Sequence, residues 1–118
     1  MRLIKENIKE NDSSREGDFA ETDSILWLWK KGYEVFKNAS CTGLADLVAY
    51  KNNELILIDV KTASFQRHKK EGNNLTKNGG RTKQQKEAEV RLLQYDPFSR
   101  DCRFIKHRGL KDLNEKET

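Results

Sequence analysis

The chain has little cysteine and no long hydrophobic run, and each shortage excludes a class of protein. Its 118 residues include two cysteines, Cys41 and Cys102, without CxxC or Cys/His spacing, so neither a structural zinc motif nor a disulfide framework is indicated. No apolar segment approaches the roughly 20 residues that cross a bilayer, and the first residues lack the apolar core of a signal peptide. We therefore expect a protein of the reducing cytoplasm that has no membrane partner and acts in association with the nucleoid.

Charged residues are abundant where apolar residues are scarce. Hydrophobic residues make up 35% of the chain and charged residues 36%, which predicts a compact core under a heavily solvated surface. The length fits a single domain. The net charge of +4 favours an anionic partner, and nucleic acid is the first candidate.

Two apolar runs joined by a short polar turn dominate the middle of the chain. Residues 44–50 and 54–61 are rich in branched apolar side chains, and the asparagine-containing turn between them predicts an antiparallel β-hairpin. Because side chains alternate between the two faces of a strand, Asp46, Asp59 and Lys61 can converge at one end of this hairpin. Carboxylates in an apolar strand are costly to bury unless they are paired, bound to metal or open to water. This pattern favours a metal-dependent nuclease site.

A helix and a strand are expected before the hairpin. Residues 1–14 are charged and predict an N-terminal arm. Residues 15–31 carry an apolar pattern followed by Gly32, which predicts a helix with a glycine C-cap. Residues 33–37 alternate as a strand does.

Two groups of side chains divide the surface of the predicted helix. Glu21 lies one turn before the core positions Ile25, Leu28 and Trp29, so its carboxylate is expected to face the sheet. Leu26 and Trp27 point elsewhere, which leaves a surplus apolar face for a sheet edge or a dimer partner.

The second half of the chain begins with a change of composition. Residues 62–80 contain many basic residues and glycines with few apolar anchors, which predicts a mobile basic loop. Residues 84–95 then predict a helix stopped by Pro97, and residues 102–107 a last strand. Residues 108–118 form a charged tail that we expect to be frayed from Lys111 onward.

The order and spacing of these acids resemble the PD-(D/E)xK nuclease superfamily. The resemblance rests on Glu21 in the first helix, Asp46, the run Asp59-Val60-Lys61, and the helix start Thr82-Lys83-Gln84-Gln85. It is closest to archaeal-type Holliday junction resolvases and VRR-NUC-like domains and spans residues 15–107. It implies a restriction-endonuclease-like α/β fold, an αβββαβ core whose central mixed sheet of about four strands is flanked by helices. Ala45 replaces the proline of the motif name, at a position that serves backbone shape.

A metal site is the first thing that the resemblance implies. Asp46 and Asp59 would bind a divalent cation together with the backbone carbonyl of Val60, and Glu21 would complete the site directly or through water. Magnesium, with manganese as a substitute, prefers such oxygen ligands. Lys61 would either orient or deprotonate the attacking water or stabilise charge on the phosphorus, and both roles stay open.

Further residues would complete the active site and bind DNA. Gln85, with Gln84 as the alternative, resembles the auxiliary glutamine of the superfamily by analogy with a Thr/Ser-x-x-Gln helix start. Gln85, Ala88 and Leu92 share one face of the predicted helix, so the side chain of Gln85 is expected to point toward the site. The residues expected to bind DNA phosphates share a positive charge and flank this site: Arg67, Lys69, Lys70, Lys77, Arg81, Lys83 and Lys86.

The resulting hypothesis is a magnesium-dependent endonuclease that hydrolyses DNA phosphodiester bonds in recombination or repair. The favoured subtype is a structure-selective resolvase of Holliday junctions and other branched DNA, acting as a homodimer. One alternative is a sequence-specific homing or restriction-type endonuclease of the same fold, and another is a non-catalytic nucleic-acid-binding module. In the structural alternative, Asp46 and Lys61 form an ion pair across the hairpin and Asp59 is solvated at its rim.

Overall fold

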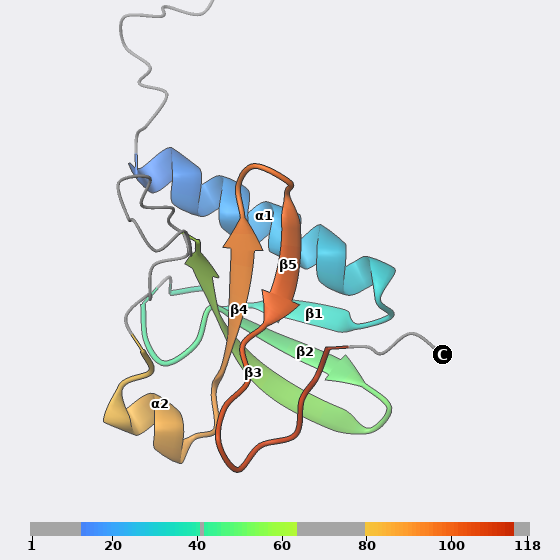
Figure 1. Cartoon of the computed structure of the whole chain (residues 1–118), viewed down its shortest axis with the longest axis vertical. Helices are drawn as coiled ribbons and strands as arrows, with labels where there is room; N and C mark the ends of the chain where they lie inside the picture. The colour runs from blue at the N-terminus through green and yellow to red at the C-terminus, as the bar shows by residue number, and fades with distance from the viewer. Residues whose placement is uncertain (1–12, 41, 64–79, 115–118) are drawn as a thin grey trace, which may run out of the picture.

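The computed structural model describes residues 13–40, 42–63 and 80–114, which form one five-stranded sheet with a long helix packed on one face (Figure 1). In chain order the elements are α1 (Ser13–Lys30), β1 (Glu34–Lys37), β2 (Leu47–Lys51), β3 (Glu54–Thr62), α2 (Lys83–Glu87), β4 (Arg91–Asp96) and β5 (Asp101–Phe104). The strands lie side by side in sequence order, and each neighbouring pair is antiparallel except β3 and β4, which are parallel. The predicted mixed α/β sheet is confirmed, with five strands in place of about four.

The predicted hairpin is formed by β2 and β3. Asn52 and Asn53 both have positive φ, 53° and 65°, which is the backbone conformation of the tight turns that suit twisted hairpins. Leu47 lies opposite Ile58, and neither side chain has any exposed surface. This face of the hairpin packs against α1 as part of the core, while the neighbouring positions face the opposite side of the sheet.

Helix α1 lies across the sheet, and β4 and β5 pass in front of it in the view of Figure 1. It ends before Gly32, whose φ of 96° fits the predicted glycine cap. Leu28 is fully buried, as expected, but the two tryptophans lie on the opposite sides from those predicted. Trp29 is 57% exposed, whereas Trp27 is half-buried and packs edge-on against Phe104 with ring centres 5.9 Å apart.

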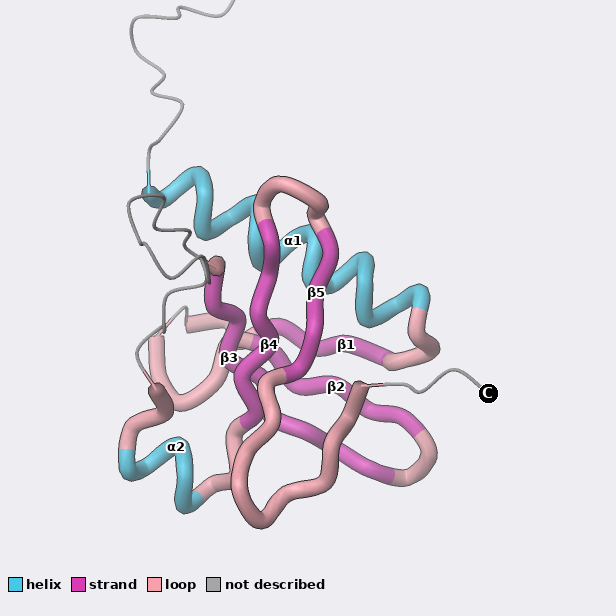
Figure 2. Tube along the Cα trace, viewed as in Figure 1, coloured by secondary structure: helices cyan, strands magenta, loops and turns pink. Residues whose placement is uncertain are grey.

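The helix predicted over 84–95 is wrong in its second half. Helix α2 ends at Glu87, and the following residues Arg91–Asp96 form strand β4 beside β3. Glu89, with φ of 60°, turns the chain between them. Leu92 and Leu93 are both buried, so a run with apolar residues on both sides of a strand was mistaken for a helix. Figure 2 shows α2 as a short helix beside the loop that leads into β2.

The chain after β5 is held against the sheet through residue 114, which corrects the expectation of a frayed tail from Lys111. The side chain of Asn114 accepts a hydrogen bond from Phe104 N at 2.9 Å and donates one to Phe104 O at 2.9 Å. Leu113 packs against the core. The arm at 1–14 and the basic loop at 62–80 lie almost wholly outside the described residues. Within the described part of the chain, no helix has the length and apolarity needed to span a bilayer.

Candidate active site

The end of the hairpin brings two carboxylates together. Asp46 directly precedes β2, and its backbone N–H donates to the carbonyl oxygen of Ile58 at 2.8 Å, the residue that also lies opposite Leu47 in the pairing of β2 and β3. The side chains of Asp46 and Asp59 lie within hydrogen-bonding reach of each other. The predicted convergence of Asp46 and Asp59 is therefore present in the structure.

Asp46 sits in an environment that disfavours its negative charge. Burial raises the pKa of Asp46 to about 6, and hydrogen bonding with Asp59 and the negative charges of Asp59 and Glu21 act in the same direction. A backbone hydrogen bond from Val60 N to Asp46 Oδ2, 2.8 Å long, opposes this rise. Two facing carboxylates of this kind repel each other, and a divalent cation between them would remove that repulsion. The donor set thus fits a hard cation.

Lys61 lies beside the carboxylate pair. Its Nζ is 3.3 Å from Asp59 Oδ2, and both side chains are partly exposed. The structural alternative, an ion pair of Asp46 with Lys61 and a solvated Asp59, is not the observed arrangement, because Lys61 pairs with Asp59. Lys61 also lies opposite Gln94 of β4 on the same face of the sheet. An ammonium group and two carboxylates therefore meet near this end of β3, and Gln94 lies on the same face of the sheet.

Glu21 approaches the pair but does not join it. Its carboxylate forms an ion pair of 2.9 Å with Lys37 of β1, and its charge still contributes to the raised pKa of Asp46. Among the residues that the structure describes, no three His, Cys, Asp or Glu side chains form a ready-made metal-binding group. Two of the three predicted acids, Asp46 and Asp59, are thus in contact, while Glu21 lies nearby in an ion pair with Lys37.

Gln85 is buried, and its side chain forms hydrogen bonds with the start of α2 and with the loop before β2. It forms a capping box with Thr82, in which Thr82 Oγ1 accepts from Gln85 N at 3.1 Å and Gln85 Oε1 accepts from Thr82 N at 3.0 Å. Gln85 Nε2 donates to Leu44 O at 2.9 Å, two residues before Asp46. Gln84 is exposed and lines an open depression of about 740 Å³ between α2 and this loop. Gln85 thus holds the loop that carries Asp46.

The predicted DNA-binding residues divide into three groups. Lys83 and Lys86 are exposed on α2. Arg81 is half-buried and donates from Nη1 to Val90 O at 3.1 Å, so it supports the chain before β4. The remaining four lie outside the described residues: Arg67, Lys69, Lys70 and Lys77.

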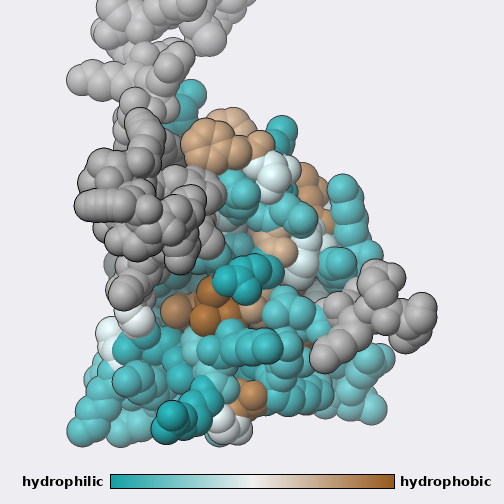
Figure 3. Space-filling model, in the orientation of Figure 1, coloured by the Kyte–Doolittle hydropathy of each residue, from teal (hydrophilic) through white to brown (hydrophobic). Residues whose placement is uncertain are grey.

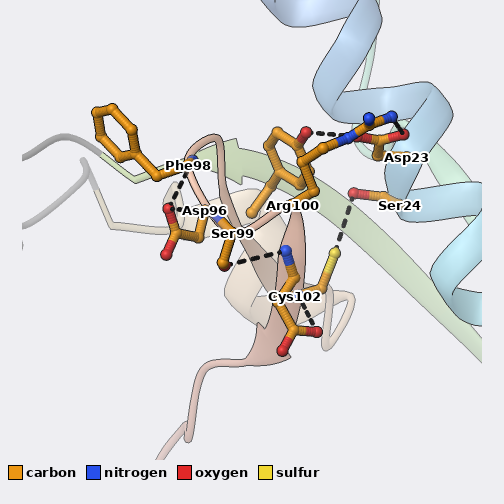
Figure 4. A network of polar contacts seen from close by, with 9 residues as sticks. Asp23, Ser24, Asp96, Phe98, Ser99, Arg100 and Cys102 are labelled. Atoms are coloured by element: carbon orange, nitrogen blue, oxygen red, sulfur yellow. Dashed lines mark hydrogen bonds and ion pairs between the residues drawn. The ribbon is translucent and has the colours of Figure 1, made fainter.

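A buried polar network close to Glu21 was not predicted. Asp23, 7% exposed, accepts two hydrogen bonds from Arg100, Nε to Oδ2 at 2.8 Å and Nη2 to Oδ1 at 2.9 Å, and a third from Tyr95 Oη (Figure 4). The bonds from Arg100 and Tyr95 lower the pKa of Asp23 to about 2. This network fastens α1 to the turn between β4 and β5. An acidic residue among the apolar positions of α1 indicates that Asp23 needs a partner, but not which residue supplies it.

Two side chains extend the network toward the core. Ser24 Oγ lies 3.6 Å from Cys102 Sγ, and both groups are buried. Burial raises the pKa of Cys102 to about 11, so this thiol is protonated and chemically quiet at neutral pH. Cys102 is a structural residue of the core.

The helix, the mixed sheet and the acidic end of the hairpin define a nuclease of the restriction-endonuclease-like fold. The solved structure of a bacterial homing endonuclease, I-Ssp6803I, has this fold, with a TM-score of 0.62 over 92% of this chain and 80% of that chain at 15% sequence identity. The model of the archaeal Holliday junction resolvase family (Hjc) matches residues 12–104, and the chain belongs to this family of the PD-(D/E)xK superfamily. Among curated proteins, none matches this chain.

Proposed function

We propose that this nuclease is a divalent-metal-dependent endonuclease that cleaves branched DNA, with Asp46, Asp59 and Lys61 at its centre. The observation that carries the proposal is the contact between the carboxyl groups of Asp46 and Asp59. Burial raises the pKa of Asp46, the neighbouring Asp59 raises it further, and the oxygen atoms of both groups can serve as donors to a cation. Membership in the junction-resolvase family supports the choice of branched DNA. In the view of Figure 3 most of the described surface is hydrophilic, with a small group of hydrophobic residues near its centre.

The carboxylates of Asp46 and Asp59 would hold the cation, with the backbone carbonyl of Val60 as a further ligand and Glu21 acting directly or through water. Magnesium or manganese supplies charge neutralisation at the phosphate and a bound water of lowered pKa. The ion pair of Glu21 with Lys37 keeps this third carboxylate within reach of the hairpin.

Lys61 would place a positive charge beside the scissile phosphate. Its contact with Asp59 holds the ammonium group beside the carboxylate pair, and this geometry favours charge stabilisation on the phosphorus over proton abstraction. Gln85 acts by positioning, since its amide fixes Leu44 and with it the approach of the chain to Asp46. Lys83 and Lys86 would contact the sugar-phosphate backbone independently of sequence.

Cleavage of matched DNAs tests this proposal. Wild type, Asp59→Asn and the control Glu34→Gln, an exposed carboxylate of β1, are each given a four-way junction, a linear duplex and a single strand of shared sequence. We expect cutting of the junction by wild type and control, and binding without cutting by Asp59→Asn. Absence of nicking by wild type at every magnesium and manganese concentration would favour the non-catalytic binding module. Preferred cutting of one duplex sequence would favour the homing or restriction-type alternative.

A homodimer would supply the two active sites that symmetric cleavage needs, and the outer side of α1 is the surface we propose for it. Phe19, Leu26 and Trp29 are 55%, 43% and 57% exposed, so the interface proposed here includes Leu26 but not Trp27. With exposed Thr22 they form a stripe that is symmetric about Ser24. Two antiparallel copies would therefore set Phe19 against Trp29 and Thr22 against Leu26, as a twofold axis requires.

Charge supports the antiparallel arrangement of this dimer, and ultracentrifugation tests it. The first half of α1 carries Asp18 and Glu21 and its last turn carries Lys30, so antiparallel copies set opposite charges along each other. We expect Leu26→Lys to dissociate the dimer and Leu55→Lys, at a 66% exposed position of β3, to leave it intact. A wild type that is monomeric at all concentrations, or a dimer broken by Leu55→Lys instead, would refute this interface.

A further inference from the structure

A row of three polar side chains crosses the sheet beside the carboxylate pair. Lys61 of β3 lies opposite Gln94 of β4, and Gln94 lies opposite Arg103 of β5. Residues opposite each other in neighbouring strands share a face of the sheet, so the three side chains lie on one face. Tyr95, the next residue of β4, points to the other face, where its hydroxyl donates to Asp23 of α1. The row therefore lies on the face turned away from α1, in front of the helix in the view of Figure 1.

Two members of this row offer hydrogen-bond donors that the described part of the chain does not use. Arg103 is exposed and Gln94 partly exposed, and neither side chain has a hydrogen-bond or ion-pair partner among the described residues. Other arginines of this half of the chain support the fold: Arg81 and Arg91 each donate to a backbone carbonyl, and Arg100 donates to a buried carboxylate. Arg103 thus differs from them, because its guanidinium group is available to a ligand.

A depression of about 300 Å³ opens beside the row. The residues that line it include Gln94, Asp96, Asp101 and Arg103. Both carboxylates already accept hydrogen bonds, Asp96 from two backbone N–H groups of the β4–β5 turn and Asp101 from an indole and a backbone N–H. They lie two residues closer to this turn than Gln94 and Arg103. An anion would therefore reach Arg103 from the side of Lys61, away from these acids.

The spacing of the strands sets the separation of the two cations in the row. Lys61 and Arg103 lie two strands apart, so their Cα atoms are about 10 Å apart at the usual strand spacing of about 4.8 Å. Successive phosphates of one DNA strand advance about 3.4 Å along the helix axis, so this separation corresponds to about three nucleotides. The guanidinium group of Arg103 can donate two parallel hydrogen bonds to one phosphate.

We propose that Arg103 and Gln94 bind a backbone phosphate of the cleaved strand, within about three nucleotides of the phosphate that lies at Lys61. This inference rests on the proposed function, since it names the part of the DNA that the same site holds. Arg103 binds the substrate and does not touch the reacting atoms. Its contact fixes the direction in which the strand crosses the sheet. A phosphate contact carries no sequence information, which suits recognition of DNA structure.

Binding without divalent metal tests the contact apart from cleavage. Wild type, Arg103→Gln, Arg103→Lys and Gln94→Ala are titrated with a fluorescent four-way junction at several salt concentrations. The control Lys106→Gln removes an exposed cation just after β5, whose Nζ lies 3.8 Å from Asp112 Oδ2. Thermal unfolding of each variant shows that it is folded.

The loss of one charged contact has a defined signature. We expect Arg103→Gln to bind the junction about tenfold more weakly than wild type, as for the loss of a hydrogen bond to a charged group. The slope of log affinity against log salt should fall by about 0.9, the contribution of one phosphate. Arg103→Lys keeps this slope because it keeps the charge. Gln94→Ala weakens binding by about threefold at an unchanged slope, since a neutral amide releases no counterion. Lys106→Gln binds within about twofold of wild type.

Uncharged phosphates locate the contact on the DNA. A methylphosphonate, which replaces one charged phosphate oxygen with a methyl group, is moved one position at a time along the strand whose cut is mapped separately with magnesium. Wild type should lose affinity at a position within about three nucleotides of the cut. Arg103→Gln should be insensitive at this position and respond like wild type at the others.

The outcomes separate this contact from the nuclease activity. Unchanged junction affinity of Arg103→Gln, an unchanged salt slope, or the same methylphosphonate pattern as wild type would overturn the proposal. A wild type that cuts junctions while Arg103→Gln binds them normally leaves the nuclease function standing. A wild type that never cuts, but whose sensitivity to one methylphosphonate disappears in Arg103→Gln, retains the phosphate contact and refutes the nuclease function.

Discussion

The buried carboxylate of Asp23 and the half-buried carboxylate of Asp46 have opposite surroundings, and the contrast distinguishes a structural acid from the acid that we propose to bind metal. Asp23 is surrounded by hydrogen-bond donors, Arg100 and Tyr95, and its pKa falls to about 2. Burial raises the pKa of Asp46 to about 6, and the neighbouring carboxylate of Asp59 acts in the same direction. The first arrangement satisfies its charge within the chain, while the second leaves a charge that a bound cation would satisfy. The same residue type thus fastens the fold in one place and prepares a site in the other.

The largest expected effect is the loss of cleavage on neutralising the hairpin pair. Asp59→Asn, or Asp46→Asn, should reduce the cleavage rate more than about 100-fold. Loss of a residue that only supports a metal ligand typically costs up to about 100-fold in activity, and loss of the ligand itself should cost more. The melting temperature should stay the same or rise, because one of two repelling carboxylates is gone. Junction cleavage and thermal unfolding of the same samples measure both. Unfolding of Asp46→Asn well below wild type would make Asp46 a structural acid like Asp23 and end the contrast.

Removal of the other carboxylate should have the opposite pattern. Asp23→Asn should destabilise the fold by roughly 2 kcal/mol, the usual contribution of hydrogen bonds to a charged group, and leave cleavage by the folded protein nearly unchanged. Urea unfolding gives the free energy, and cleavage well below the midpoint gives the activity. Cleavage lost in the folded Asp23→Asn protein would mean that Asp23 belongs to the active site, two residues from Glu21.

The stability that Asp23 supplies should depend on pH in a defined window. The pKa of Asp23 is lowered from 3.8 to about 2, so its contribution is fully present above pH 3.8 and is lost as the pH falls toward 2. The difference in unfolding free energy between wild type and Asp23→Asn should therefore shrink over this interval. A difference that grows as the pH falls would contradict the assigned network.

The smallest expected effect is stabilisation by metal. Magnesium at about five times its dissociation constant should raise the unfolding free energy of wild type by about 1 kcal/mol, since only the folded hairpin presents both acids. Asp46→Asn should show no such rise, and Asp23→Asn should show all of it. Thermal unfolding with and without magnesium provides the measurement. An equal response of all three proteins would place the cation away from the hairpin.

The features that could be predicted from the sequence are those set by neighbours in the chain. The β2–β3 hairpin follows from alternating apolar residues and the asparagine turn, and Asp46 and Asp59 meet because the hairpin brings the ends of its two strands together. Helix α1 was predicted within two residues at its start and one at its end because its apolar pattern and its glycine cap are local signals.

The features that escaped prediction depend on distant parts of the chain. Arg100 and Asp23 are 77 residues apart, so no local pattern announces their bond. Trp27 faces inward because its ring packs against Phe104 and its indole N–H donates to Asp101 Oδ1 at 3.0 Å. Strand β4 exists because β3 offers it a partner, and pairing outweighs the helical appearance of its residues.

The bond from Val60 N to the side chain of Asp46 makes one backbone amide a spectroscopic reporter. The backbone N–H of Val60 donates its hydrogen bond to a carboxylate oxygen of Asp46 and not to a main-chain carbonyl. The nuclear magnetic resonance signal of that single amide should therefore move whenever Asp46 gains a proton or a metal ion. A titration followed at Val60 would read the state of the site without any DNA in the tube.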